Sequence, residues 1–287
     1  MIDPTVAVIA PGNMGAAVGA RLVENGLKVV TSLAGRSKAS AERAAAAGMT
    51  PVSDGEVAQA DFLLSIVPPG DALALAERFA PMLQSVGRKP LYVDCNAVSP
   101  ETVSRIAAVV TDTGCAFADA GIIGGPPKAG HDGPRFYVSG PEARRLETLG
   151  EHGLAIRVMD GAIGDASALK MCYGGLTKGL TALGSALVLA ATRSGAAEAL
   201  HRELAASQPA LLAFLTGAVP RMFQKAYRFV DEMEEIANFM GRPAEQNMYE
   251  GIARLYERLA QDEAGPQQEI ASLAEFFSEP SSPRLNQ

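Results

Sequence analysis

The sequence predicts an α/β domain followed by an all-α domain. From residue 5 to about residue 160, short apolar segments alternate with helical ones, as they do in a doubly wound parallel sheet. From Asp165 onward the chain shows only helical periodicity, without a convincing strand. We therefore place the boundary near residues 161–164, which gives domains of residues 1–163 and 164–287.

The expected strands of the first domain are short and apolar. The first of them is rich in β-branched residues and lacks polar alternation, which is typical of a strand buried on both faces of a parallel sheet. Gly26 and Gly48 follow the first two helices, where glycine commonly ends a helix. The expected strands cover residues 5–10, 29–33, 62–67, 91–94, 117–120, 135–139 and 155–158, and the expected helices cover residues 16–25, 38–47, 73–86, 101–113 and 141–152.

The second domain begins with a long helix that carries one apolar stripe. Its members follow one another at intervals of three and four residues, which aligns them on a single face. They are Leu169, Cys172, Leu176, Leu180, Leu183 and Leu187. We expect this stripe to pack against a second copy of the chain, so that the helical domains form a homodimer. Residues 279–287 are expected to be loose.

Composition excludes several classes of protein. The net charge is −7 and no Lys/Arg-rich block occurs, which argues against a nucleic-acid partner. The three cysteines form no CxxC pair, so neither a disulfide framework nor a metal site is expected. The N-terminus has no signal-peptide pattern, and the most apolar stretch, residues 182–191, is too short to span a bilayer. We expect a soluble, cytoplasmic protein without a membrane partner.

A glycine-containing turn follows the first strand. Residues 10–15 read Ala-Pro-Gly-Asn-Met-Gly, which fits A-x-G-x-x-G rather than the full G-x-G-x-x-G of a Rossmann-like dinucleotide site. Gly12 would let the backbone approach a pyrophosphate, and Gly15 would let the helix pack on the strand. The helix N-terminus would supply amides for the phosphates. We predict that Pro11, Gly12, Asn13, Met14 and Gly15 bind a dinucleotide; the alternative is a plain glycine turn in an unrelated α/β fold.

The end of the second strand selects the cofactor. An NAD site usually has Asp or Glu there, about 20 residues past the motif, to hold the ribose 2′-hydroxyl. Residues 34–38 contain no carboxylate. Arg36 could pair with a 2′-phosphate, and Ser37 and Lys38 could add donors. This pattern favours NADP over NAD; the alternative is that Arg36 is a solvated loop charge.

A rigid turn follows the strand at residues 62–67. In open α/β sheets the carboxyl ends of the strands line the ligand crevice. Val67 and Pro68 are therefore candidate contacts to the cofactor, although a rigid connector without a ligand is an equal alternative.

Three later segments carry a family resemblance. They are Asp94-Cys95-Asn96-Ala97-Val98-Ser99-Pro100, Asp119-Ala120-Gly121-Ile122-Ile123-Gly124-Gly125-Pro126, and residues 161–170, which end in Leu169-Lys170. In order and spacing they resemble the substrate-binding and catalytic motifs of the β-hydroxyacid dehydrogenase family, which is related to 6-phosphogluconate dehydrogenase. The C-terminal part resembles a poorly characterised branch that has its own helical domain.

The resemblance implies roles for several residues. Asn96 would contact the cofactor and the substrate, the amides of Gly124 and Gly125 would bind a substrate carboxylate, and Lys170 would be catalytic. The chain departs from the family at Asn96-Ala97, where the family has Ser-Thr, at Gly121 for Pro and at Gly124 for Ser. Tyr173 and Gly174 stand where the family has Asn. These departures predict a substrate other than the family's usual hydroxyacids in their usual pose.

The position of Lys170 supports a catalytic role independently. It lies near the start of the long helix, and Tyr173, Gly174, Thr177 and Lys178 share its face. Such a lysine can take a proton from a substrate hydroxyl as a hydride leaves for the nicotinamide, or return it in reduction. Tyr173 could relay or supply that proton. The alternative is that Lys170 is a solvated helix charge.

Together these features predict an NADP-dependent oxidoreductase that acts on a small alcohol or carbonyl compound bearing a carboxylate. Imine reduction is one alternative: the retained Lys170 argues against it, whereas the missing family Asn argues mildly for it. A non-catalytic NADP-binding sensor is the alternative from another class. His131 lies in a Gly/Pro-rich loop and is expected to be exposed.

Overall fold

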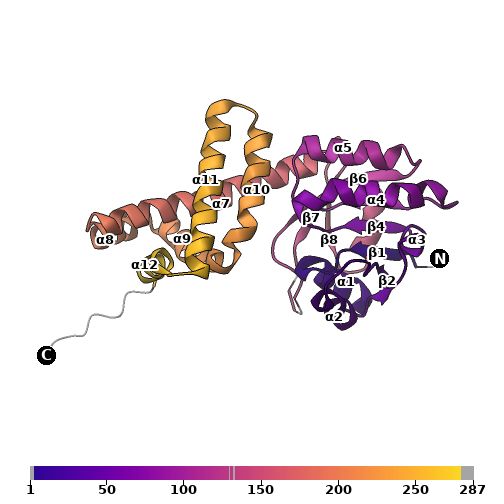
Figure 1. Cartoon of the computed structure of the whole chain (residues 1–287), viewed down its shortest axis with the longest axis horizontal. Coiled ribbons are helices and arrows are strands. Elements are labelled where there is room, and N and C mark those ends of the chain that lie inside the picture. The colour runs from indigo at the N-terminus through magenta and orange to yellow at the C-terminus, as the bar shows by residue number, and fades with distance from the viewer. Residues whose placement is uncertain (1–2, 129, 132, 279–287) are drawn as a thin grey trace. The chain divides into compact units, whose positions relative to one another are not determined.

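The computed structural model describes residues 3–128, 130–131 and 133–278 (Figure 1). Residues 279–287, expected to be loose, lie outside the described residues. The chain divides into two compact units, Met1–Met171 and Cys172–Gln287. The division falls inside helix α7 (Asp165–Arg193), so the start of this helix belongs to the first unit.

The first unit is built on one sheet with the strand order β3-β2-β1-β4-β5-β6-β7-β8. Neighbouring strands are parallel except β6 and β7, which are antiparallel. The strands are β1 (Thr5–Ile9), β2 (Lys28–Thr31), β3 (Thr50–Pro51), β4 (Phe62–Ser65), β5 (Leu91–Asp94), β6 (Ala116–Ile123), β7 (Arg135–Ser139) and β8 (Ala155–Val158). The predicted α/β architecture is confirmed.

Helices cover both faces of this sheet (Figure 1). One apolar layer joins the sheet to α1, α2 and α6, with Leu22 and Leu149 fully buried in it. The other joins it to α3, α4 and α5, with Phe79 and Ile106 fully buried. The helices are α1 (Asn13–Glu24), α2 (Lys38–Ala46), α3 (Asp54–Val57), α4 (Ala72–Ser85), α5 (Pro100–Thr111) and α6 (Glu147–Gly150), with short 3₁₀ turns at Pro69–Asp71 and Ala143–Leu146.

The structure corrects some expected elements. The two-residue strand β3 and the one-turn helix α3 carry too little periodicity to be found in the sequence. The expected helix 141–152 is a 3₁₀ turn followed by the one-turn α6, which ends at Gly150, a poor helix former. Strand β6 extends beyond the expected residue 120, because the antiparallel strand β7 pairs with it as far as Ile123.

The second unit is all helical, as predicted. Its buried core includes Leu215, Met233, Tyr256 and Leu273, which come from four different helices. Helices α10 and α11 form a pair that packs along its length (Figure 1). The unit contains most of α7, then α8 (Ala197–Ser207), α9 (Pro209–Met222), a 3₁₀ turn (Phe223–Lys225), α10 (Ala226–Met240), α11 (Pro243–Ala264) and α12 (Gln268–Phe276).

The leucine stripe of α7 does not enter the core of its own unit. Leu176, Leu180, Leu183 and Leu187 are 62%, 38%, 56% and 57% exposed. Other faces of the helix pack instead, with Ala182, Ser185 and Leu189 buried, and a small residue beside the stripe allows close approach. At Gly184, for example, a Cβ atom would lie 2.6 Å from the side chain of Leu215.

Among the described residues, α7 is the one helix that is long and apolar enough to cross a membrane. The stretch 182–191, which alone is too short, thus belongs to a longer apolar helix. A single such helix is weak evidence for a membrane span, because core helices of soluble proteins meet the same criterion.

Candidate functional site

Buried polar residues form a row across the sheet where the parallel strands end. The strand register aligns Ser65 on β4, Asp94 on β5, Asp119 on β6 and Ser139 on β7. All four residues are 0% exposed. Since buried polar groups need hydrogen-bond partners, the row orders the segments that follow these strands. We call these four residues the polar row.

The glycine turn at the end of β1 has the geometry of a phosphate-binding loop. A Cβ on Gly12 would meet nothing within 4 Å, so this backbone is open to a ligand. A Cβ on Gly15 would lie 2.1 Å from the Ala10 carbonyl oxygen, so only glycine lets α1 approach β1 here. The first turn of α1, which includes Asn13 and Met14, contains no acidic residue. This turn therefore fits the pyrophosphate of a dinucleotide.

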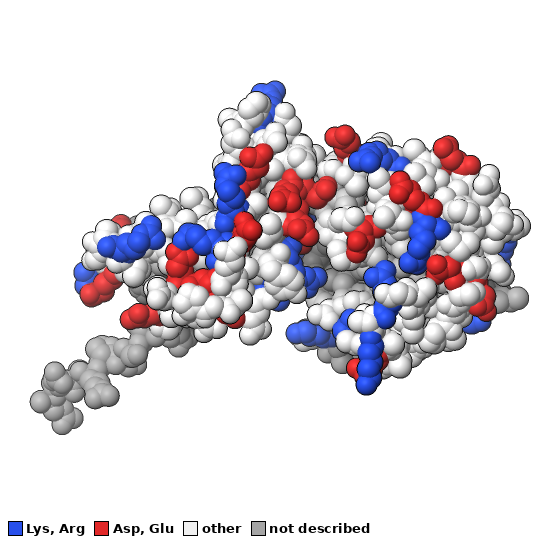
Figure 2. Space-filling model, in the orientation of Figure 1, with Lys and Arg blue, Asp and Glu red and all other residues white. Residues whose placement is uncertain are grey.

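The segment after β2 presents cationic and hydroxyl groups without a carboxylate. Arg36 is half-buried, and Ser37 is the N-cap of α2, where its hydroxyl accepts a hydrogen bond from the Ser40 amide. Lys38 is exposed and forms an ion pair with Glu42, at 3.8 Å. Lys and Arg side chains gather over the α1–α2 region in Figure 2.

Arg43, which no sequence motif indicated, joins this segment to the glycine turn. Its Nε donates to the Pro11 carbonyl at 3.0 Å, and its Nη2 donates to the Ser40 hydroxyl at 3.0 Å. The guanidinium therefore ties α2 to the backbone of the turn. Only its place one turn after Ser40, on the same face of the helix, could have indicated this role.

Asn96 links the ends of β4 and β5. Its side-chain oxygen accepts a hydrogen bond from the Val67 amide at 2.7 Å. Its side-chain nitrogen donates to the Ser65 hydroxyl at 2.8 Å and to the Asp94 carboxylate at 2.7 Å. The Asn96 side chain is thus fully engaged inside the protein and 2% exposed. Val67 is half-buried beside it, and Pro68 is exposed.

Burial dominates the electrostatics of Asp94. Desolvation raises the pKa of this carboxyl to about 7, although two hydrogen bonds from Asn96 oppose the shift. The negative charge of Asp119 raises the pKa further, and the Lys170 ammonium lowers it. Asp94 therefore titrates near neutral pH.

Asp119 holds the start of α7. One of its carboxylate oxygens accepts hydrogen bonds from the Gly164 amide at 3.1 Å and the Ser167 amide at 2.9 Å. The other accepts from the Ser167 hydroxyl at 2.7 Å. Burial raises the pKa of Asp119, and these donors oppose the shift. The carboxylate thus caps the helix end that carries Lys170.

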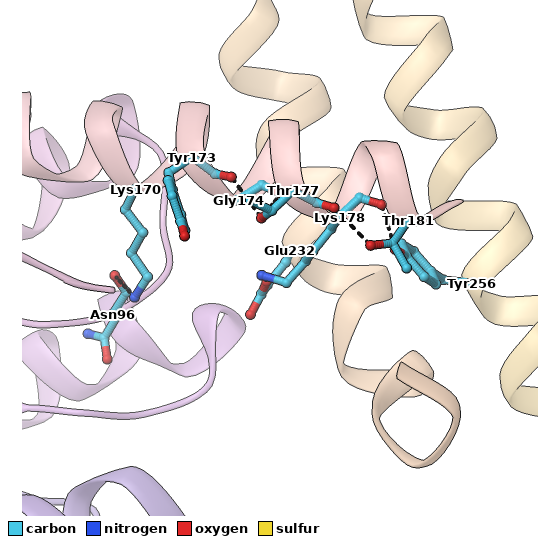
Figure 3. A network of polar contacts seen from close by, with 9 residues as sticks. All are labelled: Asn96, Lys170, Tyr173, Gly174, Thr177, Lys178, Thr181, Glu232 and Tyr256. Carbon is cyan, nitrogen blue, oxygen red and sulfur yellow. Dashed lines mark hydrogen bonds and ion pairs between the residues drawn. The ribbon is translucent and has the colours of Figure 1, made fainter. Parts of the chain in front are cut away.

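Lys170 lies at the end of this network. Its Nζ donates a hydrogen bond to the main-chain carbonyl of Asn96 at 3.2 Å (Figure 3). The amine is therefore held beside the carboxyl end of β5 within the first unit. The structure thus brings together Lys170 and Asn96, two of the predicted site residues.

The other residues on the predicted Lys170 face belong to the second unit. Tyr173 is 51% exposed, and the Thr177 hydroxyl donates to its main-chain oxygen at 2.8 Å (Figure 3). Lys178 forms an ion pair with Glu232 and lies over the ring of Phe229, 5.0 Å from its centroid. The ammonium of Lys178 is therefore already neutralised within its own unit.

Gly124 and Gly125 follow β6 and are exposed. Gly124 has φ +124°, a conformation that favours glycine. A Cβ on Gly125 would meet nothing within 4 Å, so its backbone is open to a ligand. His131 is exposed, as expected. Among the described residues, no group of three or more His, Cys, Asp or Glu could hold a metal.

The strand order, the open glycine turn and the polar end of the sheet define a dinucleotide-binding domain of the Rossmann type. Residues 5–150 match the NAD binding domain of 6-phosphogluconate dehydrogenase, and the chain belongs to this family. Residues 191–259 match a domain of unknown function, DUF1932. The predicted family and its branch with a distinct helical domain are thus confirmed.

Individual relatives agree with this placement. An uncharacterised 28.5 kDa protein of Methanothermus fervidus is 31% identical over 55% of this chain, and the match spans 59% of that protein. A probable 3-hydroxyisobutyrate dehydrogenase of Mycobacterium bovis is 27% identical over 75% of this chain and 69% of its own length. The structure of the conserved protein MTH1747, of unknown function and described as similar to 3-hydroxyacid dehydrogenases, superposes with a TM-score of 0.71. It is 29% identical, over 94% of this chain and 99% of that protein.

Proposed function

We propose that the chain is an NADP-dependent oxidoreductase that uses Lys170 as a general acid and base on a small alcohol or carbonyl substrate. The observation that carries this proposal is the hydrogen bond that holds the Lys170 amine on the Asn96 carbonyl, beside the carboxyl end of β5. That end of the sheet is where ligands of open α/β folds bind. We also propose that the enzyme acts in the cytoplasm.

The preference for NADP is supported by the residues after β2. A 2′-phosphate needs cationic donors, and Arg36 lies next to the N-terminus of α2. A ribose 2′-hydroxyl would call for a carboxylate, and residues 31–38 contain none. Pro11 to Gly15 would hold the pyrophosphate, with Arg43 fixing the turn through the Pro11 carbonyl.

The chemistry that we propose for Lys170 is proton transfer. The bound dinucleotide would supply or accept the hydride. The Lys170 ammonium would donate a proton to the oxygen of a reduced carbonyl, and the neutral amine would accept it back during oxidation. The hydrogen bond to the Asn96 carbonyl would orient the amine during both steps, whether or not Tyr173 relays the proton.

We propose that the substrate carries a carboxylate. The exposure of Gly124 and Gly125 and the open space beside Gly125 support this, because accessible backbone N–H groups bind anions. The Asn96 side chain is hydrogen-bonded within the protein. A substrate would therefore meet different contacts here from those that the Ser-Thr pair of the related motif would provide. A substrate outside the family's usual hydroxyacids follows from this difference.

Fluorescence titration with NADPH and NADH tests whether the chain binds a nicotinamide dinucleotide and which one it prefers. We expect NADPH to bind at least tenfold more tightly than NADH, and Arg36→Ala to remove this preference. Arg145→Ala is the matched control, because Arg145 is exposed and pairs with Glu142 in a local ion pair. If neither nucleotide binds at micromolar concentration, which corresponds to about −8 kcal/mol, the proposal fails.

Turnover is then assayed with NADPH and a panel of small keto acids, aldehydes and cyclic imines. The proposal is supported if the wild type reduces a carbonyl compound and Lys170→Ala does not. Reduction of the imines alone would assign the chain to imine reduction instead. Tight NADPH binding without any turnover would assign it to a sensor.

We further propose that the chain is a homodimer joined through the α7 stripe. Four leucines in one line, each more than a third exposed, form an apolar surface that is unusual for a monomer. A neighbouring groove, about 450 Å³ in volume, is lined by three leucines of the stripe, Leu176, Leu180 and Leu183, and by Met248, Ile252 and Leu255 of α11.

A further inference from the structure

We infer that Asp94 and Asp119 are positioning residues that hold the Lys170 amine from two sides. Asp94 fixes Asn96, whose carbonyl accepts the Lys170 hydrogen bond, and Asp119 fixes the helix turn from which Lys170 extends. This inference rests on the proposed function of Lys170. The contacts from which it is argued do not depend on that function.

The two carboxylates are neighbours in the sheet. They are register partners on the parallel strands β5 and β6, and both are 0% exposed. Burying two carboxylates side by side is costly, and such groups persist where each has strong hydrogen-bond donors. The donors here come from two different segments, and these are the segments whose meeting creates the Lys170–Asn96 contact.

On the Asp94 side, the carboxylate accepts two hydrogen bonds from one residue. Its Oδ1 accepts the Asn96 amide at 3.0 Å, and its Oδ2 accepts the Asn96 side-chain nitrogen at 2.7 Å. These bonds fix both the backbone and the side chain of Asn96. The carbonyl of Asn96 therefore has one orientation, and Lys170 reaches it at 3.2 Å.

On the Asp119 side, the carboxylate replaces the missing helical partners of the first turn of α7. It accepts the Gly164 and Ser167 amides, while Ser139 accepts the Ala166 amide at 3.0 Å. Lys170 lies three residues after Ser167, so the turn that Asp119 holds is the turn that projects the amine.

Gly121 completes this arrangement two residues after Asp119 on β6. A Cβ there would lie 2.6 Å from the Ala166 carbonyl oxygen and 3.2 Å from the Cβ of Lys170. Glycine therefore allows the backbone of α7 to rest on the strand, at a position where the related motif has Pro. The glycine at position 121 thus helps to hold the segment of α7 that carries Lys170 against β6.

The test uses two readouts that require no substrate. Hydrogen–deuterium exchange of peptides covering residues 162–170 reports the capped turn. The rate of acetylation of Lys170 by acetic anhydride, measured by mass spectrometry relative to Lys225, reports the hold on the amine. We expect Asp119→Ala to speed both the exchange of residues 162–170 and the acetylation of Lys170 at least tenfold. Asp94→Ala should speed the acetylation, while exchange in residues 162–170 stays within twofold of the wild type.

Two variants separate positioning from general destabilisation. Asp262 is a buried carboxylate of the second unit that accepts the Gln268 and Ile270 amides at the start of α12. Asp262→Ala should speed exchange there and leave Lys170 acetylation unchanged. Asp119→Asn keeps an acceptor oxygen for the α7 amides and should restore most of their protection, so it also serves if Asp119→Ala fails to fold.

Wild-type acetylation rates in both Asp94→Ala and Asp119→Ala would overturn the inference. The inference would also be overturned if Asp262→Ala raised the rate of Lys170 acetylation as much as Asp119→Ala does. Failure of the proposed function would give a different result from failure of this inference. Lys170→Ala would then keep its turnover, while the Asp94 and Asp119 variants would still show the expected exchange and acetylation rates.

Discussion

At the scale of single residues, Gly12 and Gly15 show how two glycines of one turn serve different purposes. The space beside Gly12 is open, whereas Gly15 faces the Ala10 carbonyl. Gly12 therefore leaves room beside the backbone, where we propose that the ligand binds, and Gly15 serves the packing of α1 on β1.

Alanine substitutions should separate these roles. Gly12→Ala should keep the thermal midpoint of the wild type and weaken NADPH binding at least tenfold, or about 1.4 kcal/mol, because the new methyl group occupies the place of the pyrophosphate. Gly15→Ala should lower the free energy of unfolding by ~1–3 kcal/mol through overpacking. Thermal denaturation and fluorescence titration measure both, and an unchanged midpoint in Gly15→Ala would contradict the close approach.

The buried carboxyl of Asp94 predicts a pH dependence of stability. Its pKa is about 7 in the folded protein, against an ordinary value of 3.8, so between these values the folded state keeps a proton that the unfolded state has lost. The unfolding free energy should therefore fall as the pH rises from about 4 to 7, by ~4 kcal/mol at most. Burial raises the pKa of Asp119 in the same direction, and the Lys170 ammonium opposes the increase at Asp94.

Urea denaturation of the wild type and Asp94→Asn at pH 5 and pH 8 measures this dependence. The variant should lose most of the decrease, because it has no charge to bury. Asp112→Asn is the control, since Asp112 is exposed at the end of α5. An equal decrease in Asp94→Asn and in the wild type would show that Asp94 is not the group responsible.

At the scale of elements, Arg43 predicts that α2 and the glycine turn act together. Arg43→Ala removes the hydrogen bond to the Pro11 carbonyl and leaves the residues of the glycine turn themselves unchanged. We expect NADPH and NADH binding to weaken by the same factor, roughly threefold to tenfold, or about 0.7–1.4 kcal/mol. A change confined to NADPH would mean that Arg43 contacts the 2′-phosphate itself.

Most elements of the α/β unit could be predicted from the sequence because they repeat one pattern. The buried strand β5 is a short apolar run, and the edge strand β8 is short and mostly apolar; the predicted bounds of both agree with the structure. The elements that were missed, β3 and α3, are too short for periodicity to show. The end of β6 depends on its pairing with β7, a contact between distant residues that local sequence does not encode.

The candidate site was predictable only in part for the same reason. Gly12, Gly15 and Lys170 occur in local motifs that the sequence displays. Asp94 and Asp119 were visible in the motifs, but their alignment in the polar row depends on the strand register. The engagement of the Asn96 side chain with Val67 joins residues 29 positions apart and could not be inferred from spacing.

At the scale of the whole molecule, the leucine stripe predicts the oligomeric state. The sequence indicated an apolar face, and the structure places that face outside the core of its own unit. Figure 2 shows Asp and Glu side chains over the α10–α11 pair, and the groove between these helices contains Glu234, Glu250 and Glu257. The apolar stripe is thus the surface of the helical unit best suited to a second copy.

A double substitution, Leu180→Glu with Leu183→Glu, should convert a dimer to monomers, because it places charges within the proposed interface. Light scattering after size exclusion measures the mass, and Leu211→Glu is the control, since this leucine is 37% exposed on α9. A monomeric wild type, or a dimer that survives the double substitution, would contradict the proposed interface.

The cap on α7 also constrains the order in which the protein can fold. The helix receives its N-terminal partners from Asp119, which precedes Ser167 by 48 residues. These hydrogen bonds form only when the start of α7 meets β6 and closes this long loop. The first turn of α7 therefore gains its N-terminal hydrogen bonds from a contact between distant residues, so the native position of the Lys170 amine depends on tertiary structure and not on α7 alone.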